Sequence, residues 1–328
     1  MKIGTTDLGD FPVLLAPMED ITDPPFRLIC REMGASAVVT EFIAADGLIR
    51  DVDKSIRKLD FNQAERPIGI QLFGNTVESM VNAARISDEA DPDFIDLNFG
   101  CPVRKIVNKG GGAALLQDIP LLLSITKEVI KAVKKPVTVK TRLGWDEKSK
   151  IIVTLSEQLQ DLGIAALTIH GRTRSQLYSG VADWTLIGEV KNNQRMHIPI
   201  IGNGDITTVE DASYARNNFG VDGIMIGRGA IGNPWLFRDI RHFFLTGEKP
   251  SPPTLVEKIA ICRRHLLDSV QWKSEITALL ETRRHYSHYF KGLPDFKSYR
   301  MKLMTAVTVN EVLNILADID SNYSMRIM

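Results

Sequence analysis

Residues 198–234, IPIIGNGDITTVEDASYARNNFGVDGIMIGRGAIGNP, hold one complete repeat of the pattern that determines the fold. The runs IPIIGN at 198 and DGIMIG at 222 are short and mostly apolar, which is typical of strands buried on both faces. Between them, TTVEDASYARNNFG has the pattern of a helix that ends at Gly220. A strand, a helix and a second buried strand in this order predict a parallel βαβ unit.

The same unit recurs before this stretch. Eight candidate strands begin at residues 11, 37, 67, 93, 136, 165, 198 and 222, as FPVLLA, AVVTE, PIGIQLF, DFIDLN, PVTVKT, AALTIH, IPIIGN and DGIMIG. Helical patterns lie between several of them, including DPPFRLICREMG, with Asp23 as a candidate N-cap and Gly34 as a stop. Eight βα units within about 235 residues predict a (β/α)8 TIM barrel. A doubly wound open sheet is the alternative, but no GxGxxG follows the first strand.

The alternation of strand and helix patterns stops after Leu245. The segment TGEKPSPPT, 246–254, has three prolines and no apolar pattern, which indicates a linker, and helical patterns fill the rest. We therefore predict a catalytic barrel over residues 1–245 and a small helical domain over 246–328.

Composition narrows the class of protein. Of 328 residues 44% are hydrophobic, and 40 Lys plus Arg balance 40 Asp plus Glu, so any nucleic-acid surface must be local. The three cysteines, Cys30, Cys101 and Cys262, are too few and too scattered for a disulfide framework or a metal site. No basic leader and no 18-residue apolar span is present. We expect a cytoplasmic protein with no metal, no membrane segment and no obligate protein partner.

The predicted strands end on residues that are mostly polar, at the place where the active sites of such barrels lie. The end residues are Met18, Glu41, Gln71, Asn98, Lys140, His170, Asn203 and Arg228, and all of them except Met18 are polar or charged. Strand ends are often polar simply because the loops that follow them are exposed to solvent, which explains some of these residues. It explains Lys140 and His170 less well, because both stand where the apolar pattern has barely ended.

Two glycine-rich turns follow the last two strands, GNGDI at 202–206 and GRGAIGNP at 227–234. Loops at these two positions commonly form a phosphate cradle, to which Arg228 would add a guanidinium. A mostly buried Lys140 needs an anionic partner, which is either Glu41 or Asp96 or the N1–O2 edge of a reduced flavin. Gln71 offers a donor and an acceptor to an imide edge, although such a glutamine is often structural.

The blocks LAPMEDITDPPFR, LNFGCP, VKTRLGW, LTIHGRTRSQLYSG, IIGNGDI and GIMIGRGAIGNPW together resemble the ordered signature set of the tRNA-dihydrouridine synthases, FMN flavoproteins, in their bacterial DusB-like form. The resemblance covers nearly the whole chain, including RRHYSHYFKGLP near its end. It implies reduction of the C5–C6 double bond of a uridine in tRNA, with the FMN reduced again by NADPH.

The resemblance also implies roles for individual residues. Asn98 and Arg142 would contact the uracil. FMN would lie across the barrel mouth, held by Ala16, Pro17, Met18, Gln71, Lys140, His170, Asn203, Gly204, Asp205, Gly227 and Arg228.

Cys101 would supply the proton that C5 needs. A thiol with a pKa of about 8.5 is mostly protonated at neutral pH and can act as a general acid. The alternative, a small buried hydrophobe, is our interpretation of Cys30 and Cys262. The three glycines at 110–112 indicate a mobile loop behind Cys101.

A uridine in folded tRNA must leave its stack to reach a barrel mouth, so the enzyme needs a local basic surface. Residues 283–302 hold six Lys or Arg, one acid and five aromatics. A helix with a solvated basic face and a buried aromatic face is the alternative. The candidate tRNA contacts are Arg172, Arg174, Arg283, Arg284 and Lys291.

Two other functions are possible on the sequence alone. One is an FMN oxidoreductase of a free pyrimidine or other small molecule, similar to dihydroorotate dehydrogenase, which would not need the basic aromatic segment. The other is an RNA-binding barrel without catalysis, which would not need Cys101, Lys140 or the phosphate turns.

Overall fold

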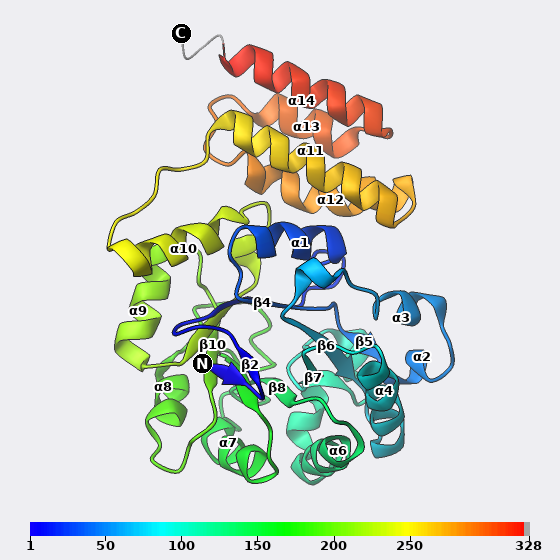
Figure 1. Ribbon diagram of the computed structural model, residues 1–328, viewed down its shortest axis with the longest axis vertical. Helices are drawn as coiled ribbons and strands as arrows, with labels where there is room; N and C mark the ends of the chain where they lie inside the picture. The colour runs from blue at the N-terminus through cyan, green and yellow to red at the C-terminus, as the bar shows by residue number, and fades with distance from the viewer. Residues whose placement is uncertain (325–328) are drawn as a thin grey trace.

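The computed structural model describes residues 1–324, and its centre is a closed barrel of parallel strands (Figure 1). β4 pairs with both β3 and β6, which closes the sheet. A short strand, β5 (Ile43–Ala44), adds to the edge of β6. The barrel strands are β3 (Val13–Leu15), β4 (Ala37–Val39), β6 (Ile68–Phe73), β7 (Phe94–Asn98), β8 (Val137–Arg142), β9 (Ala166–His170), β10 (Ile200–Asn203) and β11 (Gly223–Ile226). All eight predicted strands and the predicted fold class are confirmed.

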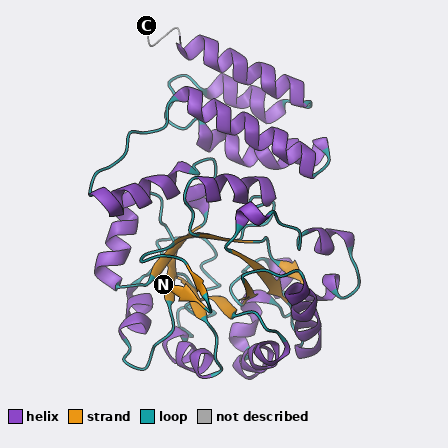
Figure 2. Ribbon diagram, in the orientation of Figure 1, coloured by secondary structure: helices purple, strands orange, loops and turns teal. Residues whose placement is uncertain are grey.

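Helices follow the strands and cover the outside of the barrel (Figure 2). Asp23 caps the first of them by accepting a hydrogen bond from the backbone N–H of Phe26 at 3.1 Å, and Gly34 follows it with φ +99°. These helices are α1 (Pro24–Glu32), α2 (Ala45–Leu48), α3 (Asp53–Arg57), α4 (Val77–Glu89), α5 (Arg104–Val107), α6 (Ile119–Ala132), α7 (Ile152–Asp161), α8 (Thr185–Asn192), α9 (Val209–Phe219) and α10 (Trp235–Thr246). Short 3-10 turns, η1 (Gln63–Glu65), η2 (Gly112–Gln117) and η3 (Arg228–Ala230), complete the loops.

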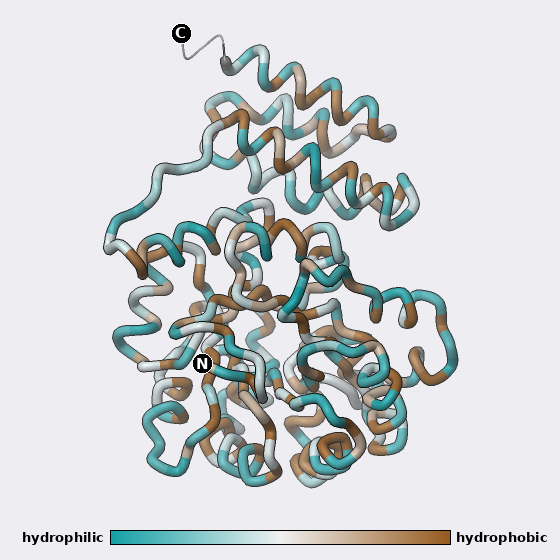
Figure 3. Tube along the Cα trace, viewed as in Figure 1, coloured by the Kyte–Doolittle hydropathy of each residue, from teal (hydrophilic) through white to brown (hydrophobic). Residues whose placement is uncertain are grey.

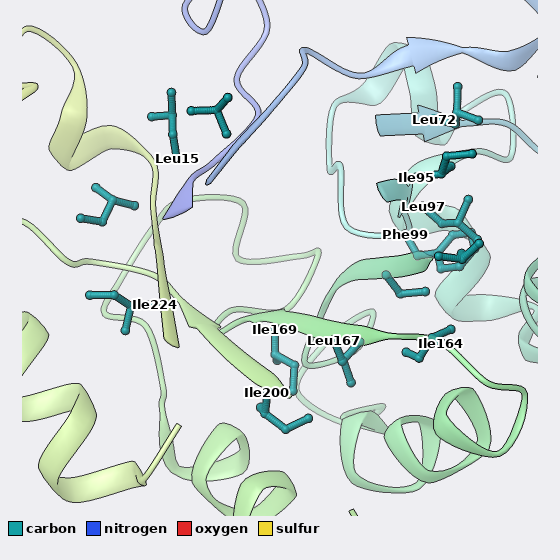
Figure 4. Close-up of a cluster of buried hydrophobic side chains, with 14 of the residues drawn as sticks. Leu15, Leu72, Ile95, Leu97, Phe99, Ile164, Leu167, Ile169, Ile200 and Ile224 are labelled. Carbon is teal, nitrogen blue, oxygen red and sulfur yellow. The ribbon is translucent and has the colours of Figure 1, made fainter. Parts of the chain in front are cut away.

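Two apolar cores sit on the two faces of the strands. The larger one lies between strands and helices and includes Leu15, Leu97, Leu167 and Ile224 (Figure 4). The smaller one fills the barrel interior, where the hairpin of β1 (Lys2–Ile3) and β2 (Thr6–Asp7) adds Ile3. Burial on both faces is why these strands have no polar alternation. The barrel is therefore a packed body, and its open cavity lies at the carboxyl ends of the strands.

Between α10 and residue 324, the last one described, lie four helices, α11 (Leu255–Trp272), α12 (Glu275–Tyr289), α13 (Lys297–Thr305) and α14 (Val309–Ser324). Hydrophobic and hydrophilic residues alternate along them in Figure 3, because one face of each packs into a separate core that includes Cys262, Leu266 and Tyr286. Cys30 and Cys262 are fully buried, as expected for small hydrophobes. Within the described residues no helix is both long and apolar enough to cross a membrane.

The helical bundle is held to the barrel through α1 and the loop before it. Lys273 Nζ lies 2.6 Å from Asp23 Oδ2, and Arg264 Nη2 donates to Glu32 at 2.8 Å. On the other side, the backbone N–H of Gly232 donates to His285 Nδ1 at 3.1 Å. These contacts place α11 and α12 over the carboxyl ends of the strands.

Candidate active site

A cavity of about 1000 Å³ lies at the carboxyl ends of the strands and is walled on one side by α11 and α12. Most of the predicted site residues meet there, because the ends of parallel barrel strands converge on one mouth. Those that line the cavity are Ala16, Pro17, Met18, Asn98, Cys101, Lys140, Arg142, His170, Asn203, Gly204, Asp205, Gly227, Arg228 and Lys291. Gln71, Arg172, Arg174, Arg283 and Arg284 are not among the lining residues.

Cys101 is held by a hydrogen-bonded turn. The side-chain oxygen of Asn98 accepts from the backbone N–H groups of Gly100 at 3.0 Å and Cys101 at 2.9 Å. Arg142 Nε donates to the carbonyl of Gly100 at 2.7 Å. The thiol is 8% exposed, and burial raises its pKa, so it carries its proton at neutral pH. Cys101 has the position and the protonation state of a proton donor at the cavity wall.

Gly112 packs directly against this turn. The next residue, Ala113, donates its backbone N–H to the carbonyl of Cys101 at 3.0 Å. Gly112 has φ +57°, and a Cβ built on it would lie 2.9 Å from the carbonyl oxygen of Cys101 and 3.2 Å from its Cβ. The glycines that the sequence suggested as a mobile loop therefore include two buried residues, Gly111 and Gly112, that allow close packing behind Cys101.

Lys140 reaches the cavity as a partly buried ammonium. Its Nζ donates to Asn203 Oδ1 at 3.1 Å, and no salt bridge joins it to an acid among residues 1–324. The two acids considered from the sequence are engaged elsewhere: Glu41 lies 3.6 Å from Lys58 Nζ, and Asp96 accepts from Thr138 at 2.6 Å. Burial lowers the pKa of Lys140 to about 8. Its one hydrogen bond goes to an amide oxygen, and the charge of Asp96 acts on it without forming a salt bridge, which leaves room for an anionic ligand in the cavity.

Gln71 supports the Cys101 turn from below. It is fully buried, its Nε2 donates to Asp96 Oδ2 at 2.6 Å, and its Oε1 accepts from Asn98 Nδ2 at 2.7 Å. Both halves of the amide are thus satisfied by the protein. A polar chain runs from Asp96 through Gln71 and Asn98 to the backbone of Cys101.

His170 faces the cavity as a neutral imidazole. Burial, followed by the charge of Arg142 and other nearby cations, lowers its pKa well below 6.5. Arg172 Nη1 lies 3.4 Å from Nε2, and because a guanidinium can only donate, the imidazole proton belongs on Nδ1. Arg172 itself is buried and pairs with Asp205 at 2.6 Å, which leaves it behind His170 rather than in the cavity.

Asp205 also binds Arg228, whose Nη2 lies 2.8 Å from Oδ1. Sequence reasoning missed Tyr178, which lines the cavity with 52% of its surface exposed. The guanidinium carbons of Arg142 and Arg228 lie 5.5 Å and 5.2 Å from its ring centroid. The sequence did contain a signal for Tyr178, since it is an aromatic residue in the loop after the sixth strand and lies close in sequence to two arginines.

The two glycine turns lie side by side because β10 and β11 are neighbours in the sheet. Gly204 has φ +130°, and a Cβ on it would lie 2.7 Å from that of Ala182; one on Gly229 would lie 2.3 Å from the carbonyl oxygen of Ile206. Only glycine fits at these positions, and both turns line the cavity. The arrangement suits a phosphate held by backbone N–H groups.

Other predicted tRNA contacts have partners within the protein. Arg174 stacks over the Trp145 ring at 4.4 Å, Arg283 donates to the carbonyl of Ala306 at 2.8 Å, and Arg284 lies 3.1 Å from Asp20. These contacts keep the three arginines out of the cavity lining.

Instead, Lys258 and His288 join Lys291 on the helical wall of the cavity. Lys258 could not be found from local sequence, since only the docking of α11 brings it there. No group of three His, Cys, Asp or Glu side chains arranged to hold a metal ion occurs within residues 1–324.

A closed parallel barrel with a polar cavity at the carboxyl ends of its strands defines the class of (β/α)8-barrel enzymes. The family model for "Dihydrouridine synthase (Dus)" matches residues 14–324, so the chain belongs to the dihydrouridine synthase family of oxidoreductases. A probable tRNA-dihydrouridine synthase of Rickettsia bellii is 39% identical, over 92% of this chain and 91% of the relative. The tRNA-dihydrouridine synthase B of Pseudomonas putida is 38% identical, over 88% and 86%.

Solved structures agree on the fold. A morphinone reductase variant in complex with tetrahydroNAD has a TM-score of 0.54 at 14% identity, over 77% of this chain and 91% of that one. A 2-naphthoyl-CoA reductase complex has a TM-score of 0.58 at 12% identity, over 74% and 51%. At these identities the likeness concerns the barrel fold alone.

Proposed function

We propose that the protein is a tRNA-dihydrouridine synthase that reduces the C5–C6 double bond of uridines in tRNA, using bound FMN that NADPH reduces again. The support is the family match, the printed activities of the relatives from Rickettsia bellii and Pseudomonas putida, and the chemistry of the cavity. We predict a cytoplasmic location, where tRNA and NADPH meet.

The residues of the cavity fit a flavin mononucleotide. The glycine turns that contain Gly204 and Gly229 both line the cavity, which suits a phosphate held by backbone N–H groups, and the Lys140 ammonium suits the electron-rich pyrimidine edge of the ring. Bound FMN would supply the hydride for C6 of the uracil. Lys140 would hold negative charge at the ring edge, and the neutral His170 would offer its Nδ1 proton as a donor.

The single observation that carries the mechanism is Cys101, a protonated thiol on a fixed turn at the cavity wall. Asn98 and Arg142 hold the backbone of this turn by hydrogen bonds, and Gly112 packs closely against Cys101. Cys101 would donate its proton to C5 of the uracil as C6 accepts the hydride. Burial lowers the pKa of Arg142 to about 10, so Arg142 stays charged at neutral pH. Its positive charge would stabilise the Cys101 thiolate that remains after the proton has been transferred.

The helical wall supports an RNA substrate over a free pyrimidine. Lys258, His288 and Lys291 extend the lined cavity beyond the barrel with cationic or basic groups that a small neutral base has no need of.

Cys101→Ala tests the proposal, with Cys262→Ala as a matched control because it removes a buried thiol from the helical core. Both proteins should be yellow and should bleach anaerobically with NADPH. Dihydrouridine formation, measured by mass mapping of tRNA, should fall by about 10²- to 10⁴-fold in Cys101→Ala only. An unchanged yield would return Cys101 to a packing role, and a wild-type protein that binds no FMN would refute the proposed function.

A further inference from the structure

A carboxylate lies inside the barrel without a cation paired to it. Asp96 is 3% exposed and stands in the middle of β7, in register with Gln71 on β6 and Thr138 on β8. Its two neighbours along the strand point outward into the larger core, so Asp96 points into the barrel. No salt bridge within residues 1–324 involves it. A buried carboxylate is costly unless it is hydrogen-bonded, so its stabilisation comes from the groups that donate to it.

The hydrogen bonds of Asp96 start a chain whose direction is fixed at both ends. The carboxylate can only accept, so Gln71 must turn its Nε2 toward Asp96 Oδ2, at 2.6 Å. The Oε1 of Gln71 is then free to accept from Asn98 Nδ2 at 2.7 Å. At the far end the backbone N–H groups of Gly100 and Cys101 can only donate, and they meet Asn98 Oδ1 at 3.0 and 2.9 Å. Each amide therefore has a single orientation that satisfies both of its neighbours.

Two simpler roles for Asp96 have to be weighed against this chain. One is a counter-charge for Lys140, because Asp96 raises the pKa that burial lowers; Lys140 Nζ nevertheless donates to Asn203 and not to the carboxylate. The other is a link between strands, because Thr138 Oγ1 donates to Asp96 Oδ1 at 2.6 Å. Neither role accounts for the second oxygen, which meets an amide that leads to the Cys101 turn.

We propose that Asp96 is a positioning residue that fixes the Cys101 turn through Gln71 and Asn98. The inference rests on the proposed function, in which Cys101 donates a proton to the uracil. Asp96 does not line the cavity, so it acts only through the side chains between. Without an acceptor at Asp96, the buried Nε2 of Gln71 would have no partner, and Gln71 would move to find one. Asn98 would then lose its acceptor, and the oxygen that holds the N–H of Cys101 would shift with it.

The test separates the acceptor oxygen of Asp96 from its charge. Asp96→Asn keeps an oxygen for Gln71 Nε2, because its own N–H groups can donate to the hydroxyl of Thr138, which accepts as well as donates. Asp96→Leu keeps the approximate size and removes the acceptor. Thr126→Val is the matched control for loss of a buried polar group, because Thr126 is fully buried on α6 and does not line the cavity.

Two measurements on the full-length protein report on the turn. Single-turnover dihydrouridine formation by the FMN-loaded protein should be roughly tenfold to 100-fold slower in Asp96→Leu and close to wild type in Asp96→Asn and in the control. Anaerobic bleaching by NADPH should remain complete in every variant, which a general loss of structure would not allow. The rate at which iodoacetamide alkylates Cys101, followed by mass spectrometry at fixed pH, should rise severalfold in Asp96→Leu only, with the fully buried Cys30 and Cys262 as internal references.

If Asp96→Leu does not fold, Gln71→Met replaces it, because it removes the amide, leaves Asp96 in place and should loosen the same turn. An unchanged alkylation rate of Cys101 in the variant that folds would overturn the proposal, as would an unchanged rate of dihydrouridine formation. Equal losses in Asp96→Asn and Asp96→Leu would also overturn it, because the charge and not the acceptor would then matter. A wild-type protein that forms no dihydrouridine would refute the proposed function instead, and the alkylation rates would still test the positioning.

Discussion

Replacing Gly112 by alanine tests whether close packing behind Cys101 positions the thiol. The new Cβ would lie 2.9 Å from the carbonyl oxygen of Cys101, about 0.5 Å inside an ordinary contact of 3.4 Å. The obstacle is backbone, so the side chain cannot simply rotate away. Either the Cys101 turn or the Gly112 turn must move.

The change has two costs that can be separated. Alanine at φ +57° carries a strain of about 1 to 2 kcal/mol, and the overpacking adds about 1 to 3 kcal/mol. Gly110→Ala is the matched control, because Gly110 has φ +81° but its Cβ would meet nothing closer than 3.6 Å. It should therefore lose only the first amount.

Thermal unfolding and single-turnover dihydrouridine formation measure the two effects. We expect Gly112→Ala to have the lower Tm of the two variants and to form dihydrouridine roughly tenfold to 100-fold more slowly, because misplacement of a reacting group by up to 1 Å has effects of about this size. NADPH oxidation should stay normal, since it does not need the thiol. Equal rates in the two glycine variants would refute the claim that Gly112 positions Cys101.

Two further substitutions test the electrostatics and the docking of the helical bundle. Burial raises the pKa of Glu41 from 4.5 to about 7, so between pH 4.5 and 7 the folded protein holds a proton that the unfolded chain has lost. The folded state therefore loses stability as pH rises through this range. As pH rises from 4.5 to 8, the free energy of unfolding of Glu41→Gln should therefore increase relative to that of wild type by up to about 3 kcal/mol. The Tm of the variant should then rise progressively above that of wild type across this pH range, and a constant difference in Tm would contradict the reasoning. Gly232→Ala would put a Cβ 2.4 Å from the carbonyl oxygen of His285, whereas Gly220→Ala meets open space at a similar φ, +64° against +56°. Calorimetry should show the larger loss in Gly232→Ala, by about 1 to 3 kcal/mol, and equal losses would mean that the contact with α12 yields freely.

Sequence patterns located the mouth of the barrel well. Asn98, His170 and Asn203 end their strands and Lys140 lies two residues before the end of β8, and parallel strands in a barrel bring such ends together regardless of the loops that follow them. Cys101 could be placed beside them because only two residues lie between it and the end of β7.

Long basic side chains could not be placed in the same way. Arg172, Arg283 and Arg284 belong to segments with the composition of a binding surface, yet their guanidinium groups bind Asp205, Ala306 and Asp20. Which partner a flexible cation takes depends on acids and carbonyls that are distant in sequence. The local pattern carries no information about those partners.

By itself, the sequence determined the closed barrel and the residues at its mouth. The apolar strand patterns and the helical patterns between them are local properties of the sequence, and their regular repetition along the chain defines the fold. Only the tertiary structure decided how the Cys101 turn is fixed and what walls the cavity. Gly112 meets Cys101 through a close approach that the glycine run alone does not reveal. Lys258 reaches the cavity only because α11 docks above a barrel whose last strand ended some thirty residues earlier.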